Sequence, residues 1–429
     1  MRIQSSLVHR ATSCFFLVFS VLTLFWAARA QDKSPPPPWA NGASRAEDLE
    51  ITLVTIGPGP GFSSWFGHTA LGVEDKRLDV NCLYNFGMYS YHQGIILELL
   101  FGRLRFWVGP MSFQRALNNW ERLDRYITIA VLYLSPEKRL EIAALLAESI
   151  KPENRYYLYQ YYKDNCSTRV RDLIDRATHG QFKKAMMASP SRLTYRDHTR
   201  RFLIRPIVDY GLMFAMSHEI DKPITIWDEM FLPCELERNV LDFKYSDENG
   251  KSVSLAASHR VVYASKHRTP PPEKRSRLWP WMLLWGFLAS GLSFLTAKMY
   301  LRGTRGGRIG FGLFQAFLGL SFGGAGVFLV FVWAFTDHTV GYHNENLFFV
   351  NLLTFAAAPL GLLVAAGKER FMPYLIKLWY VCGAIAALGI ALKIMPWFYQ
   401  NNASTIALVA PLLATTAFSM RMIDKARHS

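Results

Sequence analysis

The sequence predicts an α+β domain followed by an α-helical bundle that crosses a membrane about five times. Before about residue 277, the 429-residue chain mixes polar and apolar residues, and short β-branched runs cluster ahead of helical patterns. After that point it consists of long apolar runs joined by short polar links. Because a single hydrophobic core rarely grows past ~250–300 residues, the two parts are predicted to be separate domains.

The first thirty residues have the pattern of a secretory signal peptide. Arg2 and Arg10 form a basic region, and residues 14–27 form an apolar stretch of the usual length. Ala28-Arg29-Ala30 then supplies small residues around a cleavage site. The alternative is an uncleaved signal anchor, and in either case the domain that follows is exported.

Composition places the remaining boundaries. Residues 31–45 contain a run of prolines and are predicted to be a stiff tether. Residues 46–276 form the exported α+β domain, and residues 277–429 form the transmembrane domain. The net charge of +15 does not indicate nucleic-acid binding, because the basic residues lie partly in the links between apolar runs and partly on an exported domain, where they can face anionic lipid.

The apolar runs predict the topology. They occur at residues 279–298, 309–335, 347–366, 371–392 and 405–420, each near the ~20 residues that a bilayer requires. The first and third links and the tail contain Lys and Arg, whereas the second and fourth links contain none. By the positive-inside rule, this alternation places the exported domain outside the membrane and the C-terminus in the cytoplasm.

The second link, residues 337–346, is unusually polar. It contains His338, His343, Asn344 and Asn346 as well as two acids. A metal site and a solvated interfacial loop are both compatible with this composition. We favour a polar surface that faces the exported domain or the lipid headgroups.

Within the exported domain, short β-branched or glycine-bounded runs predict strands ahead of a helix. The strands are expected at residues 51–56, 68–73, 83–88 and 126–134. Pro136 then opens a helix at its first position. This order of elements is typical of an α+β fold.

The cysteines identify one candidate for chemistry. Cys14 lies in the signal and Cys382 in an apolar run, which leaves Cys82, Cys166 and Cys234 in the exported domain. An odd number of exported cysteines leaves at least one thiol without an intrachain partner. Cys82 and Cys234 are either bridged or free, and only Cys166 has surroundings that indicate reactivity.

Cys166 is predicted to lie on the first turn of an amphipathic helix. Apolar residues follow it at positions 170, 173, 174 and 177, and Asp164 or Asn165 can cap the helix. A thiol at that position has its pKa lowered by the free amides, and the same amides can stabilise an oxyanion. A buried structural cysteine is the alternative.

A base for this thiol is expected at His68, at the start of a strand after a glycine-rich turn. A strand-borne histidine and a helix-start cysteine are the two components of thiol acyl transfer, although a structural histidine remains the alternative. Asn85 is the preferred group to orient the imidazole, with Tyr84 beside it. Arg169 can hold a phosphate, but pairing with Asp164 or Asp172 is favoured.

These motifs resemble a known family. Phe66-Gly67-His68-Thr69-Ala70-Leu71, Tyr84-Asn85-Phe86-Gly87 and the segment from Asp164 to Asp172 are similar to the signature of Lnb-type lipoprotein N-acyltransferases. Further similarities lie at residues 194–196, at 230–233 and in the loop through Asn344 and Asn346, so the resemblance spans most of the chain beyond the tether.

The resemblance implies a circularly permuted papain-like domain in which His-bearing strands precede the Cys-bearing helix. It also implies a cofactor-independent acyltransferase that moves an acyl chain from phospholipid, through a Cys thioester, to the amine of a diacylglyceryl-cysteine lipoprotein. Catalysis is then expected of Cys166, His68 and Asn85, without a metal. Substrate contacts are expected of Asn165, Arg169, Tyr84, His338, Asn344 and Asn346.

Two other functions remain open from the sequence. A thiol hydrolase of lipid esters or peptide amides would use the same residues, with water in place of the amine. A non-enzymatic membrane sensor or scaffold would need neither, and the intact His–Cys pair argues against it.

Overall fold

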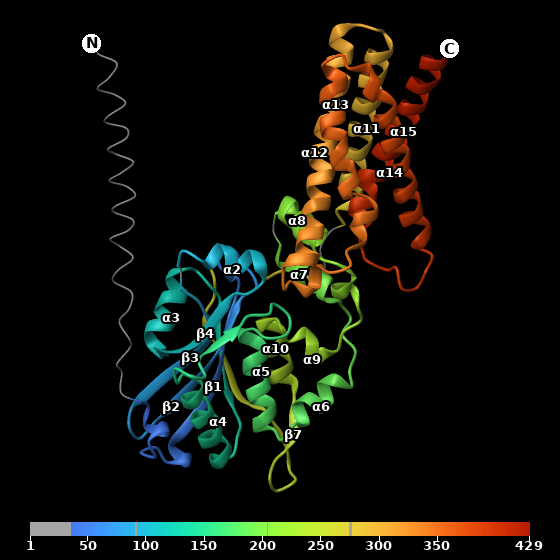
Figure 1. Cartoon of the computed structure of the whole chain (residues 1–429). Helices are drawn as coiled ribbons and strands as arrows, with labels where there is room; N and C mark the ends of the chain where they lie inside the picture. Colours follow the sequence, from blue (N-terminus) through green and yellow to red (C-terminus); the bar gives the residue numbers. More distant parts are fainter. Residues whose placement is uncertain (1–35, 91, 204, 274–276) are drawn as a thin grey trace, which may run out of the picture.

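The computed structural model describes residues 36–429 except 91, 204 and 274–276, so the predicted signal peptide lies outside the described residues. A sheet-containing domain and a bundle of long helices lie end to end (Figure 1). The predicted α+β class is confirmed, because an antiparallel sheet domain precedes a region of apolar helices. Among the described residues, the first part contains nine strands, seven in the main sheet and two in a separate hairpin, together with several short helices, whereas the second part contains only helices and their connections.

The main sheet is antiparallel at every pairing, in the order β6-β4-β3-β2-β1-β5-β9. Its strands are β1 (Leu49–Ile56), β2 (His68–Asp75), β3 (Val80–Met88), β4 (Arg105–Ser112), β5 (Ile127–Leu132), β6 (Tyr156–Leu158) and β9 (Ala256–Tyr263). The four strands expected from the sequence are present as β1, β2, β3 and β5. Sequence reasoning missed β4, β6 and β9 because they lie toward the two edges of the sheet, where burial imposes little alternation.

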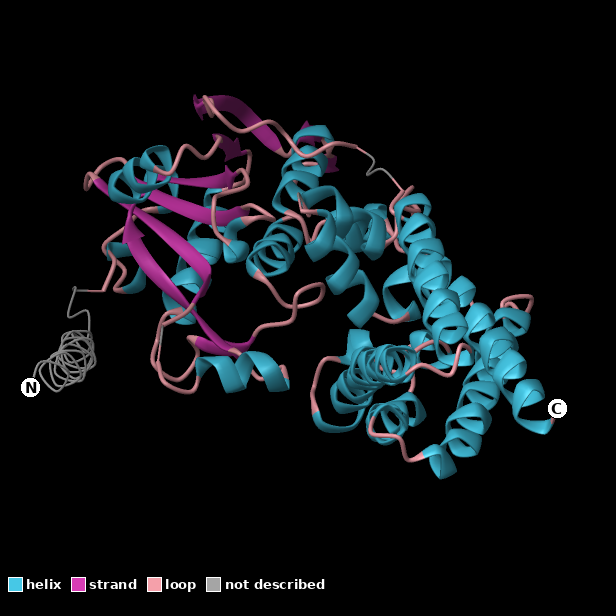
Figure 2. Cartoon of the chain, turned by 90° about the horizontal axis from the view of Figure 1, so that it is seen from above, coloured by secondary structure: helices cyan, strands magenta, loops and turns pink. Residues whose placement is uncertain are grey.

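Helices cover both faces of the sheet. On one face lie α4 (Pro136–Ser149), α5 (Cys166–Ala177) and α10 (Pro233–Asp242), whose apolar residues share a core with Leu53 and Leu71. On the opposite face α3 (Phe113–Arg122) packs against the alternate residues Val54 and Ala70. Figure 2 shows the strands side by side with helices on either side of them. Because successive side chains of each central strand point to opposite faces of the sheet, they contribute alternately to the two cores.

A helical segment connects this domain to the bundle. It contains α6 (Gln181–Met187), α7 (Tyr195–Phe202), α8 (Pro206–Ala215), the 3₁₀ turn η4 (His218–Asp221) and α9 (Ile226–Glu229). Reciprocal capping boxes begin α7 and α9, where Thr194 pairs with Asp197 and Thr225 with Asp228. In Figure 1, α7 and α8 lie at the base of the bundle, between it and the sheet.

Among the described residues, four helices are long and apolar enough to cross a membrane: α11 (Trp279–Leu301), α12 (Arg305–Phe335), α14 (Met372–Leu392) and α15 (Ala403–His428). The third predicted span is not one helix. It is a pair of segments, Thr339–Phe348 and Leu352–Ala365, bent by 61°, so the expected number of five is reached only if this pair counts as one span. The side chain of Asn351 accepts a hydrogen bond from the amide of Leu353 (3.1 Å) at the break, starting a new helical segment there.

Glycines in α12 allow the second of these segments to pack closely. A Cβ atom at Gly312, Gly319, Gly323 or Gly326 would overlap the backbone of residues 351–365. In a bilayer, where lipid is as apolar as the side chains, such small-residue contacts bring helices together by packing. The glycine stripe therefore explains why α13 (Ala357–Ala365) lies along α12.

Candidate functional site

The predicted residues come together at one edge of the sheet, formed by the ends of the central strands β1, β2 and β5. His68 is the first residue of β2 and pairs with Ile56, the last residue of β1, which in turn pairs with Ile127 at the start of β5. Arg125 lies two residues before Ile127 and therefore at the same edge. The helix α5, which begins at Cys166, packs against β2 and β3. Strand register and one helix start thus assemble groups that are far apart in the sequence.

Asn165 builds the start of α5. Its Oδ1 accepts hydrogen bonds from the amides of Ser167 (2.8 Å) and Thr168 (2.9 Å), and the hydroxyl of Thr168 accepts one from the Asn165 amide (2.8 Å). Its Nδ2 donates to the carbonyl oxygens of Tyr161 (2.8 Å) and Phe231 (3.0 Å). Of the two caps that the sequence allowed, Asn165 is the one used. Because these contacts occupy both ends of its amide, Asn165 positions Cys166 through the helix.

The thiol of Cys166 is buried, with 7% of the residue exposed. Burial raises the pKa of this thiol above its ordinary value, and it outweighs the hydrogen bonds from the amides of Thr69 and Ser167 and the positive charge of Arg125. The sequence-based expectation of a lowered pKa is therefore wrong for this state, because desolvation disfavours the thiolate more than the helix start favours it. The resting group is a neutral thiol.

The imidazole of His68 is hydrogen bonded to Asn85, with 3.1 Å between Nε2 and Oδ1, and it lies 5.9 Å from the Trp120 ring, centroid to centroid. Burial and, to a smaller extent, the charge of Arg125 lower the pKa of His68 to about 4, although the hydrogen bond to Asn85 acts in the opposite direction. Since Oδ1 can only accept, Nε2 carries the proton of the neutral ring. Nδ1 is then left with a lone pair and can act as a base.

The thiol and the imidazole lie at the same edge but are not hydrogen bonded to each other among the described contacts. The amide of Thr69, the residue after His68, is hydrogen bonded to the thiol of Cys166. Arg125 acts on both groups electrostatically. Catalytic hydrogen bonds are often long before a substrate binds, so this geometry is compatible with a pair that closes on substrate.

A bulge in β3 lies beside the thiol. Gly87 has a φ of +86°, and the pairing of β3 with β4 shifts register between Asn85 and Met88. A Cβ at Gly87 would lie 3.6 Å from the Cβ of Cys166 and 3.4 Å from the Tyr159 ring. These are ordinary van der Waals distances, so it is the positive φ that requires glycine here, and bulges commonly occur beside such sites.

Sequence reasoning missed Arg125 and Tyr159. The hydroxyl of Tyr159 is hydrogen bonded to the thiol of Cys166. The Nε of Arg125 donates to the carbonyl oxygen of Gly57 (2.9 Å), and its Nη2 is buried with no hydrogen-bond partner among the described residues. The one signal for Tyr159 was the dense run of tyrosines at residues 156–162, whereas Arg125 had none, because only the strand register brings it to this edge.

Two predicted substrate contacts are occupied elsewhere. The hydroxyl of Tyr84 accepts a hydrogen bond from Nε1 of Trp39 (2.9 Å), and Tyr84 is fully buried in the core. Arg169 forms two hydrogen bonds with Asp164 (2.6 and 2.8 Å), and its guanidinium lies 3.7 Å from the centre of the Tyr157 ring. The expected structural pairing of Arg169 is therefore confirmed.

The loop at residues 337–346 faces the exported domain. The side-chain amides of Asn344 and Asn346 each donate to the carbonyl oxygen of Phe214 (2.9 Å), and Asn344 also donates to that of Ala215 (3.1 Å). His338 is hydrogen bonded through Nε2 to the carbonyl oxygen of Leu99 (2.8 Å). These three predicted substrate contacts thus join the two domains. Within the described part of the chain, no cluster of three or more His, Cys, Asp or Glu could hold a metal ion.

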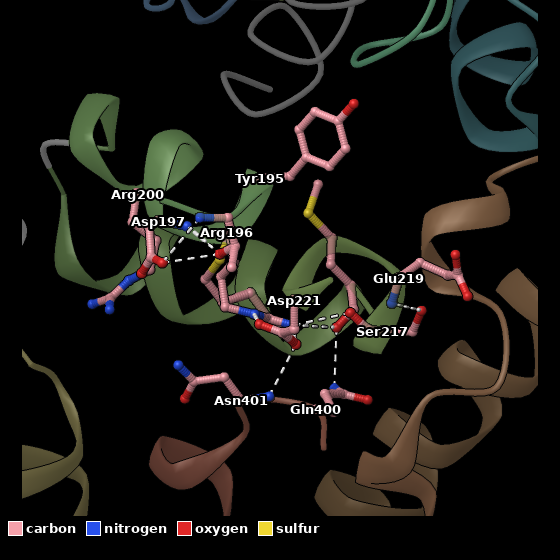
Figure 3. A network of polar contacts seen from close by, with 12 residues as sticks. Tyr195, Arg196, Asp197, Arg200, Ser217, Glu219, Asp221, Gln400 and Asn401 are labelled. Atoms are coloured by element: carbon pink, nitrogen blue, oxygen red, sulfur yellow. Dashed lines mark hydrogen bonds and ion pairs between the residues drawn. The ribbon is translucent and has the colours of Figure 1, made fainter. Parts of the chain in front are cut away.

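A second polar network completes this junction (Figure 3). Arg196 is 2% exposed and forms two hydrogen bonds with Asp221 (2.6 and 3.0 Å). Asp221 also accepts from the amide of Asn401 (2.9 Å), and Nε2 of Gln400 donates to the carbonyl oxygen of Met216 (3.1 Å). Residues 400–401 precede α15, so this network fastens the exported domain to the bundle.

The comparisons with known proteins agree with this arrangement. Residues 36–201 match the family described as the Lnb N-terminal periplasmic domain, a segment that includes the strands with His68 and Asn85 and the helix with Cys166. A search of curated proteins and a search of solved structures each gave no match. The periplasmic domain precedes helices able to span a membrane. Residues 36–201 are therefore an Lnb-type N-terminal periplasmic domain, followed in the same chain by helices long and apolar enough to span a membrane.

Proposed function

We propose that the protein is a cysteine-dependent lipoprotein N-acyltransferase of a bacterial inner membrane, with its C-terminus in the cytoplasm. The observation that carries this proposal is the thiol of Cys166 at the start of α5, beside the His68–Asn85 pair at one edge of the sheet. The His-bearing strands precede the Cys-bearing helix, as in a circularly permuted papain-like domain. A thiol, a base and an orienting group are the components of covalent acyl transfer.

The first half-reaction uses the neutral state of both groups. Nδ1 of His68 removes the thiol proton of Cys166 as the sulfur attacks an acyl ester carbonyl of a phospholipid. The resulting oxyanion can be stabilised by the backbone amide of Cys166 at the helix start and by the hydroxyl of Tyr159. The imidazolium then returns the proton to the leaving alkoxide, which releases a lysophospholipid and leaves a thioester on Cys166.

The second half-reaction transfers the acyl group to an amine. The α-amine of a diacylglyceryl-cysteine at a lipoprotein N-terminus attacks the thioester, and His68 removes the amine proton. Collapse of the tetrahedral intermediate forms the amide and releases the thiolate, which takes the proton back from the imidazolium. Both substrates are anchored in the membrane, so a catalytic domain fastened to a bundle of apolar helices meets them without their leaving the lipid.

The test is expression of the full chain in a bacterial strain that lacks lipoprotein N-acylation. We expect the wild type to restore N-acylated lipoprotein N-termini, detected by mass spectrometry, and Cys166→Ala to restore none while it accumulates normally in the membrane. Cys234→Ala is the matched control, because that thiol is also free and lies on the first turn of a helix, but of α10 and not of α5. N-acylation that persists in Cys166→Ala contradicts the proposal, whereas release of free fatty acid without an acceptor by the wild type favours a hydrolase.

The acid limb of the pH profile reports the state of His68. Because the pKa of His68 is about 4, the base is neutral and competent above that pH, and kcat/KM is expected to decline only as pH falls toward 4. Replacing Arg125 with Met removes a cation that lowers this pKa, so the acid limb should move toward neutral pH. Exposed Arg122→Met is the control and should leave the limb in place. An Arg125→Met limb identical to that of the wild type contradicts the electrostatic role.

A further inference from the structure

The helix α2 (Ile95–Phe101) presents apolar side chains outward. Ile96 is 73% exposed and Leu97 59%, and Leu99 and Leu100 are also exposed. A soluble domain seldom leaves four aliphatic side chains of one short helix exposed to solvent. Such a surface indicates contact with a partner or a membrane. The segment contains a single acidic residue, Glu98, and no basic residue. Its composition therefore fits an apolar partner.

Contacts with the helical bundle fix the position of α2. The ring of Phe101 lies 5.8 Å from that of Phe331, centroid to centroid, on the last turns of α12. The carbonyl oxygen of Phe101 accepts from the amide of Asp337 (2.8 Å), and the guanidinium Nε of Arg103 lies 2.8 Å from Oδ2 of the same aspartate. Gly102, with a φ of +73°, lets the chain turn closely against His338. The helix α2 is thus attached at the end of a predicted span.

The helix α8 is hydrogen bonded to the same loop, residues 337–346. Asn344 and Asn346 bind the carbonyl oxygens at its C-terminal end, and its Phe214 packs against the core of the bundle. At its other end Ile207 is 81% exposed. Loop 337–346 therefore holds two short apolar helices of the exported domain beside the ends of the spans.

We propose that α2 and α8 lie in the leaflet of the bilayer that faces the periplasmic domain, with Ile96, Leu97 and Ile207 among the acyl chains. The contacts of the two helices carry this inference, because α2 contacts the end of α12 and both α2 and α8 are hydrogen bonded to the loop that follows α12. Interfacial helices of this kind bury an apolar face at the boundary between headgroups and acyl chains. The occupant of this exposed apolar surface is accordingly lipid.

The placement of α2 also connects the bilayer to the thiol. The helix α2 lies between the end of β3 at Met88 and the start of β4 at Arg105. Three rings beside these ends are in contact: Tyr89 lies 5.3 Å from Phe106, and Phe106 lies 4.3 Å from Tyr159, centroid to centroid. Tyr159 contacts Cys166. If the protein transfers acyl chains as proposed above, these rings are the contacts that link the helix at the bilayer to the thiol.

Membrane insertion can be measured without any activity. The full chain, with its native cysteines replaced by alanine, would carry a single NBD fluorophore at Leu97→Cys or at Asn249→Cys in vesicles of phosphatidylethanolamine and phosphatidylglycerol. Asn249 is exposed on the turn between β7 (Lys244–Ser246) and β8 (Ser252–Ser254), which lies far from the bundle in Figure 1. We expect a blue shift and strong quenching by spin-labelled lipid at position 97 and neither at position 249. Equal spectra at the two positions overturn the proposal.

A second pair of variants tests the role of α2 in access to lipid. Leu97→Glu places a charge among the acyl chains and should reduce acyl transfer from phospholipid at least tenfold, whereas Leu97→Trp suits the interface and should retain activity. Transfer from a water-soluble short-chain thioester should be equal in both. Unchanged phospholipid transfer in Leu97→Glu contradicts the access role. Loss of quenching would contradict insertion alone, and absence of any transfer in the wild type would contradict only the proposed function.

Discussion

Replacing His68 and Cys166 together is expected to slow acyl transfer no more than replacing Cys166 alone, by about 10³-fold or more in either case. In the proposed mechanism both groups are used in one step, in which the imidazole removes the proton of the attacking thiol. Once the nucleophile is gone, the base has nothing to activate, so the two losses do not add. The measurement is the initial rate of N-acylation of a synthetic diacylglyceryl-cysteine peptide by the full chain in phospholipid micelles.

Asn85→Ala tests the group that orients His68 and is expected to have a smaller effect than this double variant. It removes the hydrogen bond that places the proton on Nε2 of His68, so the imidazole can adopt the other tautomer and present the wrong nitrogen to the thiol. We expect a loss smaller than that of His68→Ala, and no further loss when the two are combined. Cys82→Ala is the control, because that thiol lies on β3 away from the helix start. Losses that multiply between His68 and Cys166 would show that they act independently.

Replacing Arg196 with Met is expected to destabilise the chain by about 3–5 kcal/mol, since it leaves Asp221 as a buried charge without its partner. Arg196 donates to Asp221 and to the carbonyl oxygens of Met213 (2.9 Å) and Ser217 (3.1 Å). Asp221 in turn holds the amide of Asn401 in the bundle. The loss should therefore appear as lower resistance to urea and as faster proteolysis between the two domains.

The double variant Arg196→Met/Asp221→Asn distinguishes a buried charge from a simple loss of packing. Removing both charges leaves no uncompensated ion, so this chain should be more stable than Arg196→Met alone. Arg176→Met is the control, because its ion pair with Glu141 is largely exposed and contributes about 0–1 kcal/mol. A double variant less stable than both single ones would show that contacts other than the charge pair dominate the junction.

The sequence was most informative where a pattern is local. The helix that begins at Cys166, its asparagine cap and the strand that begins at His68 each follow from periodicity, capping chemistry or glycine-bounded runs over a few residues. The apolar runs also predicted the membrane helices, because length and hydrophobicity alone determine whether a segment can span a bilayer. The break in the third run at Asn351 was missed, because hydrophobicity summed over a window does not show where one helical segment ends and the next begins.

Only the tertiary structure decided which of these groups lie together and in what electrostatic state. Strand register brings Arg125 to the edge that holds His68, and burial reverses the expected shift in the pKa of Cys166, because desolvation depends on everything packed around the thiol. The structure likewise assigns Asn344, Asn346 and His338 to the junction between the domains. By itself, then, the sequence determined a helix-start thiol, a strand-borne histidine and a membrane domain. Their mutual geometry and the exposed apolar face of α2 were decided by long-range packing. A pattern over a few residues carries no information on such packing.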